Sequence, residues 1–360
     1  MKLRIAIAGT RGIPNQYGGF EQFAQCLSKG LVERGHLVTV YNTHDHPYQN
    51  NEWNGVEIIH RRDLKYLGTA GQFIYDLNCI RHARKRKFDV LVILGYTSSS
   101  VWGKWFPKKT VIVTNMDGME WKRSKYSKPV QFFLRYAEKL AIRFSHYHIA
   151  DSVAVKQYLE SKYGEPVRFI SYGSEIPSVV DDSILLRYGL AKDQYYLLIA
   201  RMEPENNIEV ILDGVHKRND GKKTIVVGNT ENKFGRAMKL KFVNDPHIVF
   251  VGAIYDRASL DSLRANCLLY FHGHSVGGTN PSLLEAMSCG AVICAHDNEF
   301  NRWVLGEDAY WFNDAAGIAA LVTDQNKNAS MAMANLEKIR KNHSWKKIID
   351  EYESIFLNAY

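Results

Sequence analysis

A glycine-rich segment runs directly into a helix-forming segment in the second half of the chain. Residues 274–293 read HSVGGTNPSLLEAMSCGAVI, in which Gly-Gly-Thr-Asn at 277–280 precedes an apolar run that contains Glu285. Free backbone amides at the start of a helix bind anions, so this pattern is typical of a phosphate site. A carboxylate one turn further along can accept two hydrogen bonds from vicinal hydroxyl groups. The segment therefore favours a nucleoside diphosphate; the alternative is that Glu285 only stabilises the helix N-terminus.

A second anion-binding position follows a strand expected at residues 195–200. The loop IARMEPENN at 199–207 places Arg201 at the end of that strand. A guanidinium can hold a diphosphate with two parallel hydrogen bonds, and open α/β sheets bind ligands beyond the carboxyl ends of their strands. The alternative is a surface ion pair of Arg201 with Glu203 or Glu205.

A third loop, GTRGIPNQYGGFEQF at 9–23, follows the first expected strand. Gly9 and Gly12 come after the strand, and Gly18 and Gly19 stand where a helix begins, so the backbone can approach a phosphate closely. A dehydrogenase would need Gly-x-Gly-x-x-Gly and an acidic residue at the end of the second strand, where this chain has Tyr41-Asn42. The pattern argues against nicotinamide chemistry; a tight turn without a ligand is the alternative.

A fourth loop, TNMDGMEWKRSKYS at 114–127, combines acidic, aromatic and basic residues after a buried strand. Asp117, Glu120, Trp121 and Arg123 suit a ligand rich in hydroxyl groups, because carboxylates accept hydroxyl protons and an aromatic face covers a sugar ring. The position of the loop favours this function. The alternative is a solvated loop that Trp121 anchors in the core.

Strands and helices alternate along the chain and position these loops. In the first half we expect strands at 3–8, 36–41, 56–60, 89–94, 110–114 and 148–150, and helices at 20–34, 72–86 and 128–144. In the second half we expect strands at 195–200, 223–227, 247–251, 268–272 and 292–294, and helices at 207–217, 233–242, 258–266 and 281–288. This alternation predicts two doubly wound domains, with a linker near 171–178.

Length and composition narrow the class of protein. The 360 residues, 46% of them apolar, suit two domains with separate cores. No apolar run approaches the roughly 18 to 20 residues that span a bilayer, and the N-terminus predicts a strand rather than a secretion signal, so a cytoplasmic protein is expected. Five scattered cysteines without a Cys-x-x-Cys pair predict neither a disulfide framework nor a zinc site.

Charge is distributed unevenly. Residues 1–175 contain 26 Lys/Arg against 15 Asp/Glu, whereas the remainder contains 20 against 23. The basic segment 122–147 also carries Phe, Leu and Tyr, a mixture that can lie on anionic lipid; a core-packed helix with a basic outer face is the alternative. Nucleic acid is not expected as a partner, because the second half is not basic and no recognition motif is found.

At these motifs the sequence resembles the family 4 retaining glycosyltransferases, which have the GT-B fold. GGTNPSLLEAMSCGAVI is similar to their nucleotide-sugar motif. Together with it, GTRGIPNQYGGFEQF, NMDGMEWKR and ARMEPENN resemble a bacterial subfamily containing rhamnosyltransferases of capsule and surface-polysaccharide assembly. The resemblance covers nearly the whole chain. It implies an α/β protein with two doubly wound Rossmann-like domains facing a central cleft: residues 1–173 for the acceptor, 174–342 for the nucleotide sugar, and a helix at 343–360 that crosses back to the first domain.

The resemblance also implies roles for individual residues. Arg201 matches an arginine that binds the donor diphosphate, Glu285 matches a glutamate that binds the ribose, and Asp117 falls where many relatives have a histidine near the transferred sugar. We therefore expect Asp117, Arg201 and Glu285 to be catalytic. The donor is expected to contact Gly18, Gly19, Arg201, Asn206, Gly228, His274, Gly277, Gly278, Thr279, Asn280 and Glu285, and the acceptor to contact Glu120, Trp121 and Arg123.

Two positions depart from the wider family. Gly277 stands where the first glutamate of a pair is expected, and Asn206 stands where a lysine is expected five residues after Arg201. Both departures also belong to the narrower subfamily, so they do not indicate an inactive protein. They place neutralisation of the diphosphate on Arg201 and on backbone amides.

The expected reaction uses neither a metal nor a cofactor. No Asp-x-Asp pair is present, so Arg201, helix dipoles and amides would neutralise the diphosphate. The resemblance implies retention of configuration, L-rhamnose from dTDP-rhamnose as the transferred sugar, and a lipid-linked glycan as acceptor, at the inner face of the membrane. The alternatives are a hexosyltransferase that uses a UDP- or GDP-sugar, a GT-B nucleotide-sugar epimerase, and a non-catalytic nucleotide-sugar-binding protein.

Overall fold

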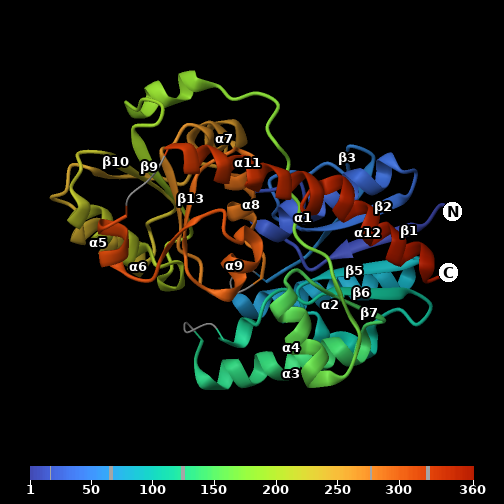
Figure 1. Cartoon of the computed structure of the whole chain (residues 1–360). Helices are drawn as coiled ribbons and strands as arrows, with labels where there is room; N and C mark the ends of the chain where they lie inside the picture. Colours follow the sequence, from blue (N-terminus) through green and yellow to red (C-terminus); the bar gives the residue numbers. More distant parts are fainter. Residues whose placement is uncertain (17, 65–67, 123–125, 276–277, 322–324) are drawn as a thin grey trace. The chain divides into compact units, whose positions relative to one another are not determined.

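The chain divides into two compact units in the computed structural model, which describes residues 1–16, 18–64, 68–122, 126–275, 278–321 and 325–360. The first unit comprises Met1–Tyr172 and Trp345–Tyr360, and the second comprises Gly173–Ser344. Each unit is built on one sheet (Figure 1). No helix in the described ranges is both long enough and apolar enough to cross a membrane.

The sheet of the first unit has eight strands in the order β3-β4-β2-β1-β5-β6-β7-β8. All neighbouring strands are parallel except β3 and β4. The strands are β1 (Arg4–Ala8), β2 (Leu37–Thr43), β3 (Glu52–Trp53), β4 (Val56–Arg61), β5 (Val90–Leu94), β6 (Val111–Asn115), β7 (Tyr147–Ala150) and β8 (Val167–Phe169). The helices are α1 (Gly19–Glu33), α2 (Thr69–Lys85), α3 (Lys128–Phe144), α4 (Val153–Tyr163) and α12 (Trp345–Asn358), with short 3-10 helices η2 (Ser100–Trp105) and η3 (Glu120–Lys122).

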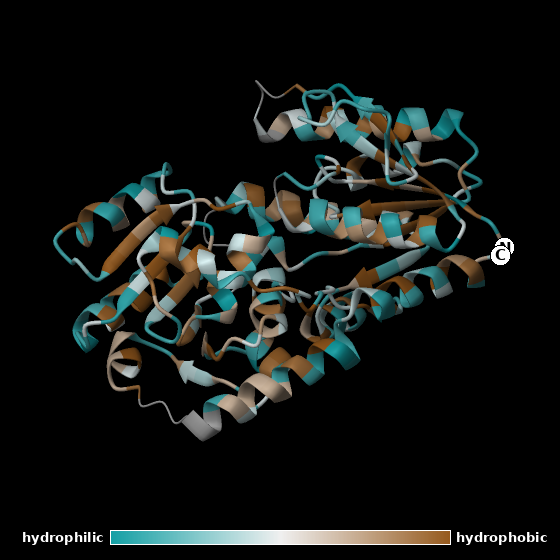
Figure 2. Cartoon of the chain, turned by 90° about the horizontal axis from the view of Figure 1, so that it is seen from above, coloured by the Kyte–Doolittle hydropathy of each residue, from teal (hydrophilic) through white to brown (hydrophobic). Residues whose placement is uncertain are grey.

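The strands form the apolar centre of each unit. Strand β5, with the sequence Val-Leu-Val-Ile-Leu, is buried along its whole length. A parallel strand that is covered by helices on both faces reads as such a continuous hydrophobic run, without alternation. In Figure 2 many of the strands are brown, and so hydrophobic, whereas the helices also carry hydrophilic residues in teal.

The C-terminal helix α12 completes the core of the first unit. Its residues Tyr352 and Phe356 are fully buried, and the ring of Tyr352 meets the ring of Phe23 in α1 with 5.3 Å between centroids. Gly30 lets the two helices approach, because a Cβ atom there would lie 2.3 Å from Cδ1 of Ile349. Helices α1 and α12 are seen side by side in Figure 1.

The sheet of the second unit has six parallel strands in the order β11-β10-β9-β12-β13-β14. The strands are β9 (Tyr195–Ile199), β10 (Lys223–Val227), β11 (Ile248–Gly252), β12 (Leu269–His272), β13 (Ile293–His296) and β14 (Tyr310–Phe312). The helices are α5 (Ile208–Arg218), α6 (Lys233–Lys241), α7 (Arg257–Ala265), α8 (Pro281–Ser288), α9 (Glu299–Leu305), α10 (Ala315–Ala319) and α11 (Gln325–Asn342), with 3-10 helices η4 (Asp182–Tyr188) and η5 (Pro204–Asn206). The strand order reverses between β9 and β12, which makes their carboxyl ends the expected position of a ligand.

The predicted alternation of strands and helices is confirmed in both units. The bounds differ by at most a few residues; β2, for example, continues to Thr43. The sequence did not predict β3, β8, β14, α4, α9, α10 or α11. Four of these elements have five residues or fewer, which is too short for a periodic pattern to develop.

Candidate functional site

Arg201 lies two residues beyond the end of β9, on an exposed turn of the second unit. The turn is closed at its backbone, because the carbonyl oxygen of Arg201 accepts hydrogen bonds from the Glu203 amide and from Nδ2 of Asn206, both at 2.7 Å. Within the described residues no ion pair joins Arg201 to Glu203 or Glu205. The guanidinium therefore stands at the edge of the sheet without a carboxylate partner from this loop.

Asn206 connects the Arg201 turn to the loop after β12. Its Oδ1 lies 2.9 Å from Nδ1 of His274, and both side chains are buried. Because Nδ2 of Asn206 already donates to Arg201, Oδ1 is the acceptor, so Nδ1 of His274 carries the proton. Asn206, at the position where a lysine was expected, thus fixes both the turn that carries Arg201 and the orientation of the His274 ring.

Further backbone contacts hold these two loops together. The amide and hydroxyl of Ser275 both donate to the carbonyl oxygen of Glu205, at 3.1 and 2.7 Å. At Gly273 a Cβ atom would lie 2.0 Å from the carbonyl oxygen of Asn206, so only glycine permits the approach. The two loops follow β9 and β12, the strands between which the sheet order reverses, and the second unit therefore presents a preorganised crevice edge there.

The glycine-rich segment before α8 was expected to supply backbone amides. Gly277 lies outside the described residues, Gly278 is partly exposed and Thr279 is buried. Asn280 is the N-cap of α8, and its Oδ1 accepts from the Ser282 amide at 2.9 Å. The Asn280 side chain therefore serves its own helix, which leaves the backbone around Gly278 as the described part of the expected anion site.

Glu285 on α8 has two arginine partners that the sequence analysis did not predict. Its Oε2 bonds to Nη2 of Arg264, and its Oε1 lies 3.7 Å from Nη1 of Arg257. The side chain of Arg264 is only 2% exposed and that of Glu285 13% exposed. Burial alone would lower the pKa of Arg264, but Glu285 and the other anionic groups around it raise the pKa on balance. These ion pairs fix the orientation of the Glu285 carboxylate.

Gly228, the donor residue expected after β10, is explained by packing. A Cβ atom at this position would lie 2.2 Å from the carbonyl oxygen of Ala200, directly before Arg201. The Gly228 amide also donates to the Gly252 carbonyl at 2.9 Å. Gly228 therefore allows the strand ends of β9 and β10 to approach, and contact with a donor stays a prediction.

The glycine loop of the first unit is held by side chains on two sides. Asn42 at the end of β2 accepts from the Ile13 amide at 3.0 Å and donates to the Ile13 carbonyl at 2.7 Å. The buried carboxylate of Glu21 accepts from the Thr10 hydroxyl at 3.0 Å and from the Arg11 amide at 2.8 Å. Asn42, which replaces the acidic residue of a dehydrogenase, thus shapes the loop itself.

The end of the glycine loop leads into α1. Gly18 is the N-cap, no side chain caps the helix, and Gly19 is its first residue. Amides in the first turn of an uncapped helix are suited to an anion. At the start of the loop, Gly9 has a φ of +87°, and a Cβ atom there would lie 2.3 Å from the Leu94 carbonyl oxygen, so this position requires glycine.

Asp117 has an unusual backbone conformation just after β6. Its φ is +52°, in the left-handed region that residues other than glycine, asparagine and aspartate rarely adopt. Its amide donates to Oδ1 of Asn115 at 2.9 Å, while Nδ2 of Asn115 donates to the Tyr352 hydroxyl of α12 at 3.2 Å. The surrounding structure therefore holds Asp117, which is partly exposed, in a strained conformation of the kind found at functional sites.

Two family models each match one half of the chain. Residues 187–352 match the model of glycosyl transferases group 1, and residues 2–175 match a domain of unknown function. An uncharacterized glycosyltransferase of Methanocaldococcus jannaschii is 23% identical over 291 residues, which cover 76% of this chain and 73% of that protein. An uncharacterized 42.6 kDa protein in the cps region of Klebsiella pneumoniae is 39% identical over 59 residues, 16% of each chain.

Solved structures share the fold over the whole chain. The sucrose-phosphate synthase of Thermosynechococcus elongatus superposes with a TM-score of 0.82 at 14% identity, over 99% of both chains. Anabaena HepE in complex with UDP superposes with a TM-score of 0.76 at 16% identity, over 100% of both chains. The chain is a glycosyltransferase, and its residues 187–352 are its group 1 domain. Its fold is GT-B, with two Rossmann-like α/β domains, as the family resemblance implied.

The loop at residues 114–127 of this glycosyltransferase, which contains Trp121, is anchored more firmly than the sequence indicated. Arg123 lies outside the described residues, and Glu120 is buried. Nε1 of Trp121 donates to Oε2 of Glu138 on α3 at 3.2 Å, and the Arg135 guanidinium lies 4.2 Å from the centre of the indole ring. Trp121 is thus tied to α3, in line with the anchoring alternative, and contact with an acceptor stays a prediction.

Glu138, like Arg264 and Arg257, was not predicted from the sequence. Besides Trp121, its buried carboxylate accepts hydrogen bonds from the Tyr158 hydroxyl at 2.9 Å, the Tyr163 hydroxyl at 2.7 Å and Nζ of Lys162 at 2.8 Å. No local pattern predicts this cluster, since its members come from η3, α3 and α4. A glutamate within the apolar face of an amphipathic helix was the available signal.

Proposed function

We propose that this glycosyltransferase moves L-rhamnose from dTDP-β-L-rhamnose to a hydroxyl group of a lipid-linked glycan, with retention of configuration and without a metal ion. The observation that best supports a donor site is the chain of hydrogen bonds from Arg201 through Asn206 to His274. It lies where the strand order of the second unit reverses. Membership of the glycosyltransferases favours a nucleotide sugar there, and Anabaena HepE, which shares the fold, has been solved with UDP and with UDP-glucose.

Each part of the donor would meet a different group of the second unit. The exposed guanidinium of Arg201 is suited to two parallel hydrogen bonds with the diphosphate. The carboxylate of Glu285, whose position Arg264 and Arg257 fix, would accept hydrogen bonds from the ribose hydroxyl groups. Amides near Gly278, at the positive end of α8, would complete neutralisation of the diphosphate.

Transfer follows from the charge that develops at the sugar. The acceptor oxygen forms its bond to the anomeric carbon on the face from which the diphosphate leaves, while the bond from that carbon to the phosphate oxygen breaks. The leaving phosphate takes the acceptor proton, so no nucleophile of the protein is required. Arg201 and the amides would stabilise the departing diphosphate, and Asp117, held at positive φ, would orient the sugar or stabilise its cationic transition state.

The proposed lipid-linked acceptor is supported by one face of α3. At 100° per residue, Lys128, Phe132, Tyr136, Lys139 and Arg143 point to the same side of the helix. All five are exposed, Phe132 by 76% and Tyr136 by 53%. A helix face that combines lysine and arginine with aromatic residues is suited to an anionic lipid surface.

One experiment tests donor and stereochemistry together. The protein is incubated with dTDP-rhamnose, UDP-glucose, UDP-galactose or GDP-mannose and a lipid-linked glycan fraction, and the product is analysed by proton NMR. We expect a β-linked rhamnoside. An exclusive preference for a UDP- or GDP-linked hexose would overturn the rhamnose assignment and favour the hexosyltransferase, whereas an α-linked rhamnoside would contradict retention.

The same assay separates the remaining alternatives. A GT-B epimerase would release an altered free sugar without an acceptor. A non-catalytic protein would bind the nucleotide sugar without turnover. The departures at Asn206 and Gly277 motivated that last alternative, but Asn206 has a defined position in the bridge to His274, which favours an active enzyme.

A further inference from the structure

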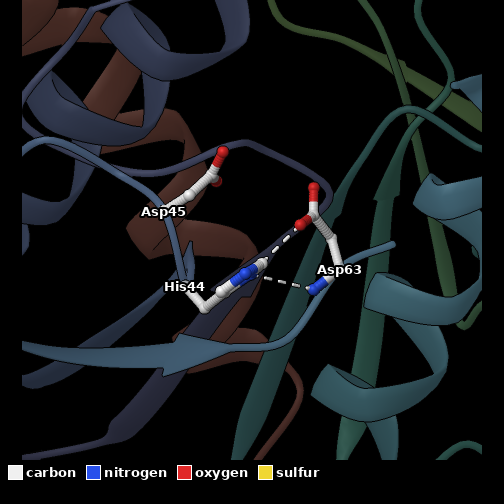
Figure 3. Close-up of side chains that lie close together, drawn as sticks. All are labelled: His44, Asp45 and Asp63. Carbon is white, nitrogen blue, oxygen red and sulfur yellow. Dashed lines mark hydrogen bonds and ion pairs between the residues drawn. The ribbon is translucent and has the colours of Figure 1, made fainter. Parts of the chain in front are cut away.

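Two side chains capable of binding a metal meet at the edge of the first unit because of strand register. Strands β2 and β4 are parallel neighbours, with Thr43 opposite Arg61, and the His44 amide donates to the Arg61 carbonyl at 2.9 Å. The residues that follow these strands therefore lie beside each other. Figure 3 shows the result, in which His44 and Asp63 point toward one another from the two segments.

The His44 ring is the neighbour of the Asp63 carboxylate here, and the two form an ion pair only when that ring is protonated. The side chain of Asp63 is only 9% exposed, and its buried Oδ1 has no hydrogen-bond partner in the described structure. Nδ1 of His44 lies 3.1 Å from that Oδ1 and also 3.3 Å from the Asp63 amide. If Nδ1 of His44 is unprotonated, its lone pair accepts the hydrogen bond from the Asp63 amide but is repelled by the Asp63 carboxylate. If Nδ1 is protonated, it attracts the carboxylate but cannot accept from the amide. A cation between Nδ1 and Oδ1 would gain from both electron pairs.

A third ligand stands next to this pair. Asp45 follows His44 in the chain, and one ligand atom from each of His44, Asp45 and Asp63 lies within 4.8 Å of the other two. We propose that these three residues bind one divalent transition-metal ion of the Zn²⁺ type. An imidazole nitrogen with two carboxylates suits zinc and its neighbours, while Mg²⁺ and Ca²⁺ prefer oxygen ligands alone.

The ion would brace the loops at this edge of the sheet. It would link the segment after β2 to the segment after β4, and β2 in turn holds the glycine loop, since the Thr43 amide donates to the Arg11 carbonyl at 2.9 Å. The unfolded chain has no such preformed site, so binding stabilises the folded state. This role is independent of the donor chemistry proposed above, because no diphosphate takes part in it.

The test uses the full-length protein after treatment with EDTA and removal of the chelator. We expect titration calorimetry with Zn²⁺ to give one equivalent bound, and the melting temperature to rise by about 5 °C at 100 times the dissociation constant. Asp63→Asn preserves the shape of the side chain and should weaken Zn²⁺ binding at least about tenfold. Asp45→Asn, at an exposed position, provides a second variant should Asp63→Asn unfold.

The matched control breaks another histidine–aspartate pair. His216 lies 2.6 Å from Asp245 in the second unit, and Asp245→Asn should leave Zn²⁺ affinity unchanged. The proposal is overturned if the wild-type protein binds no Zn²⁺, or if the Asp63 and Asp45 variants bind it as tightly as the wild type does. A thiolate charge-transfer band in the spectrum of the Co²⁺-loaded protein would also overturn it, because that band would place the ion on a cysteine.

Discussion

The guanidinium of Arg264 bonds to the carboxylate of Glu285 inside the second unit, so that a nearly fully buried cation and a mostly buried anion neutralise each other. Removal of Arg264 leaves the mostly buried carboxylate with the longer contact to Arg257 and without its close partner. We expect Arg264→Met to lower the free energy of unfolding by about 3 to 5 kcal/mol. Urea unfolding measures this loss. Arg340→Met, which breaks an exposed pair with Glu337, should cost less than about 1 kcal/mol, and similar losses in both variants would contradict the prediction.

Arg201→Ala should weaken the binding of the nucleotide sugar and of the free nucleoside diphosphate in parallel. A charge-assisted contact to phosphate is worth about 1.5 to 3 kcal/mol, which corresponds to a loss of affinity of about ten- to a hundredfold. Titration calorimetry with both ligands measures the change. Arg187→Ala, another exposed arginine of the second unit, serves as the control. Unchanged binding of both ligands to Arg201→Ala would show that the diphosphate lies elsewhere.

Transfer should proceed at full rate in EDTA. The chain has no Asp-x-Asp pair to hold a metal–diphosphate, and Arg201 with the amides before α8 would take over neutralisation. The measurement is the initial rate with EDTA and with added Mg²⁺ or Mn²⁺, well below the melting temperature. An activity that vanishes with the chelator and returns with either ion would refute the metal-free mechanism.

Substitutions of Asp117 should separate backbone strain from chemistry. Both asparagine and glycine tolerate the φ of +52° observed there, so Asp117→Asn and Asp117→Gly should fold with at least wild-type stability. If the carboxylate orients the sugar or stabilises positive charge, both variants should lose kcat by at least about tenfold. Thermal unfolding tests the predicted stability of the two variants, and steady-state kinetics tests the predicted loss of kcat. Wild-type kcat in both variants would limit Asp117 to a role in the loop.

Asp76 on α2 should make stability depend on pH. Burial raises its pKa from 3.8 to about 7, although hydrogen bonds from Ser98 and Gln72 act in the opposite direction. Between about pH 4 and 7 the folded state keeps a proton that the unfolded state has released, so stability falls as the pH rises, by about 1.4 kcal/mol per pH unit. In Asp76→Asn, the free energy of unfolding measured with urea should not show this decrease between about pH 4 and 7. An equal slope in both proteins would contradict the assignment.

The sequence predicted what depends on local pattern. Apolar runs located the central strands, and glycines, Arg201 and Glu285 marked the loops beyond their carboxyl ends. The partners of those residues were not predictable, because they are brought together by the tertiary fold. Arg264 has its place in a periodic helix, but nothing local indicates that its buried guanidinium meets Glu285. Likewise, the sequence shows only that Asn206 stands where relatives have a lysine. Its contact with His274 depends on the pairing of β9 with β12.

The place of α12 in the first unit has a consequence for the newly made chain. Gly173–Ser344 is one continuous stretch that can complete its core as soon as it is synthesised. The first unit begins earlier but lacks Tyr352 and Phe356, which are fully buried in it, until residues 345–358 have been made. During that interval Phe23 can pack against Tyr172 but lacks its contact with Tyr352, and Gly30 lacks Ile349. The domain that is translated first is thus the one that finishes folding last, because its core waits for a helix from the far end of the chain.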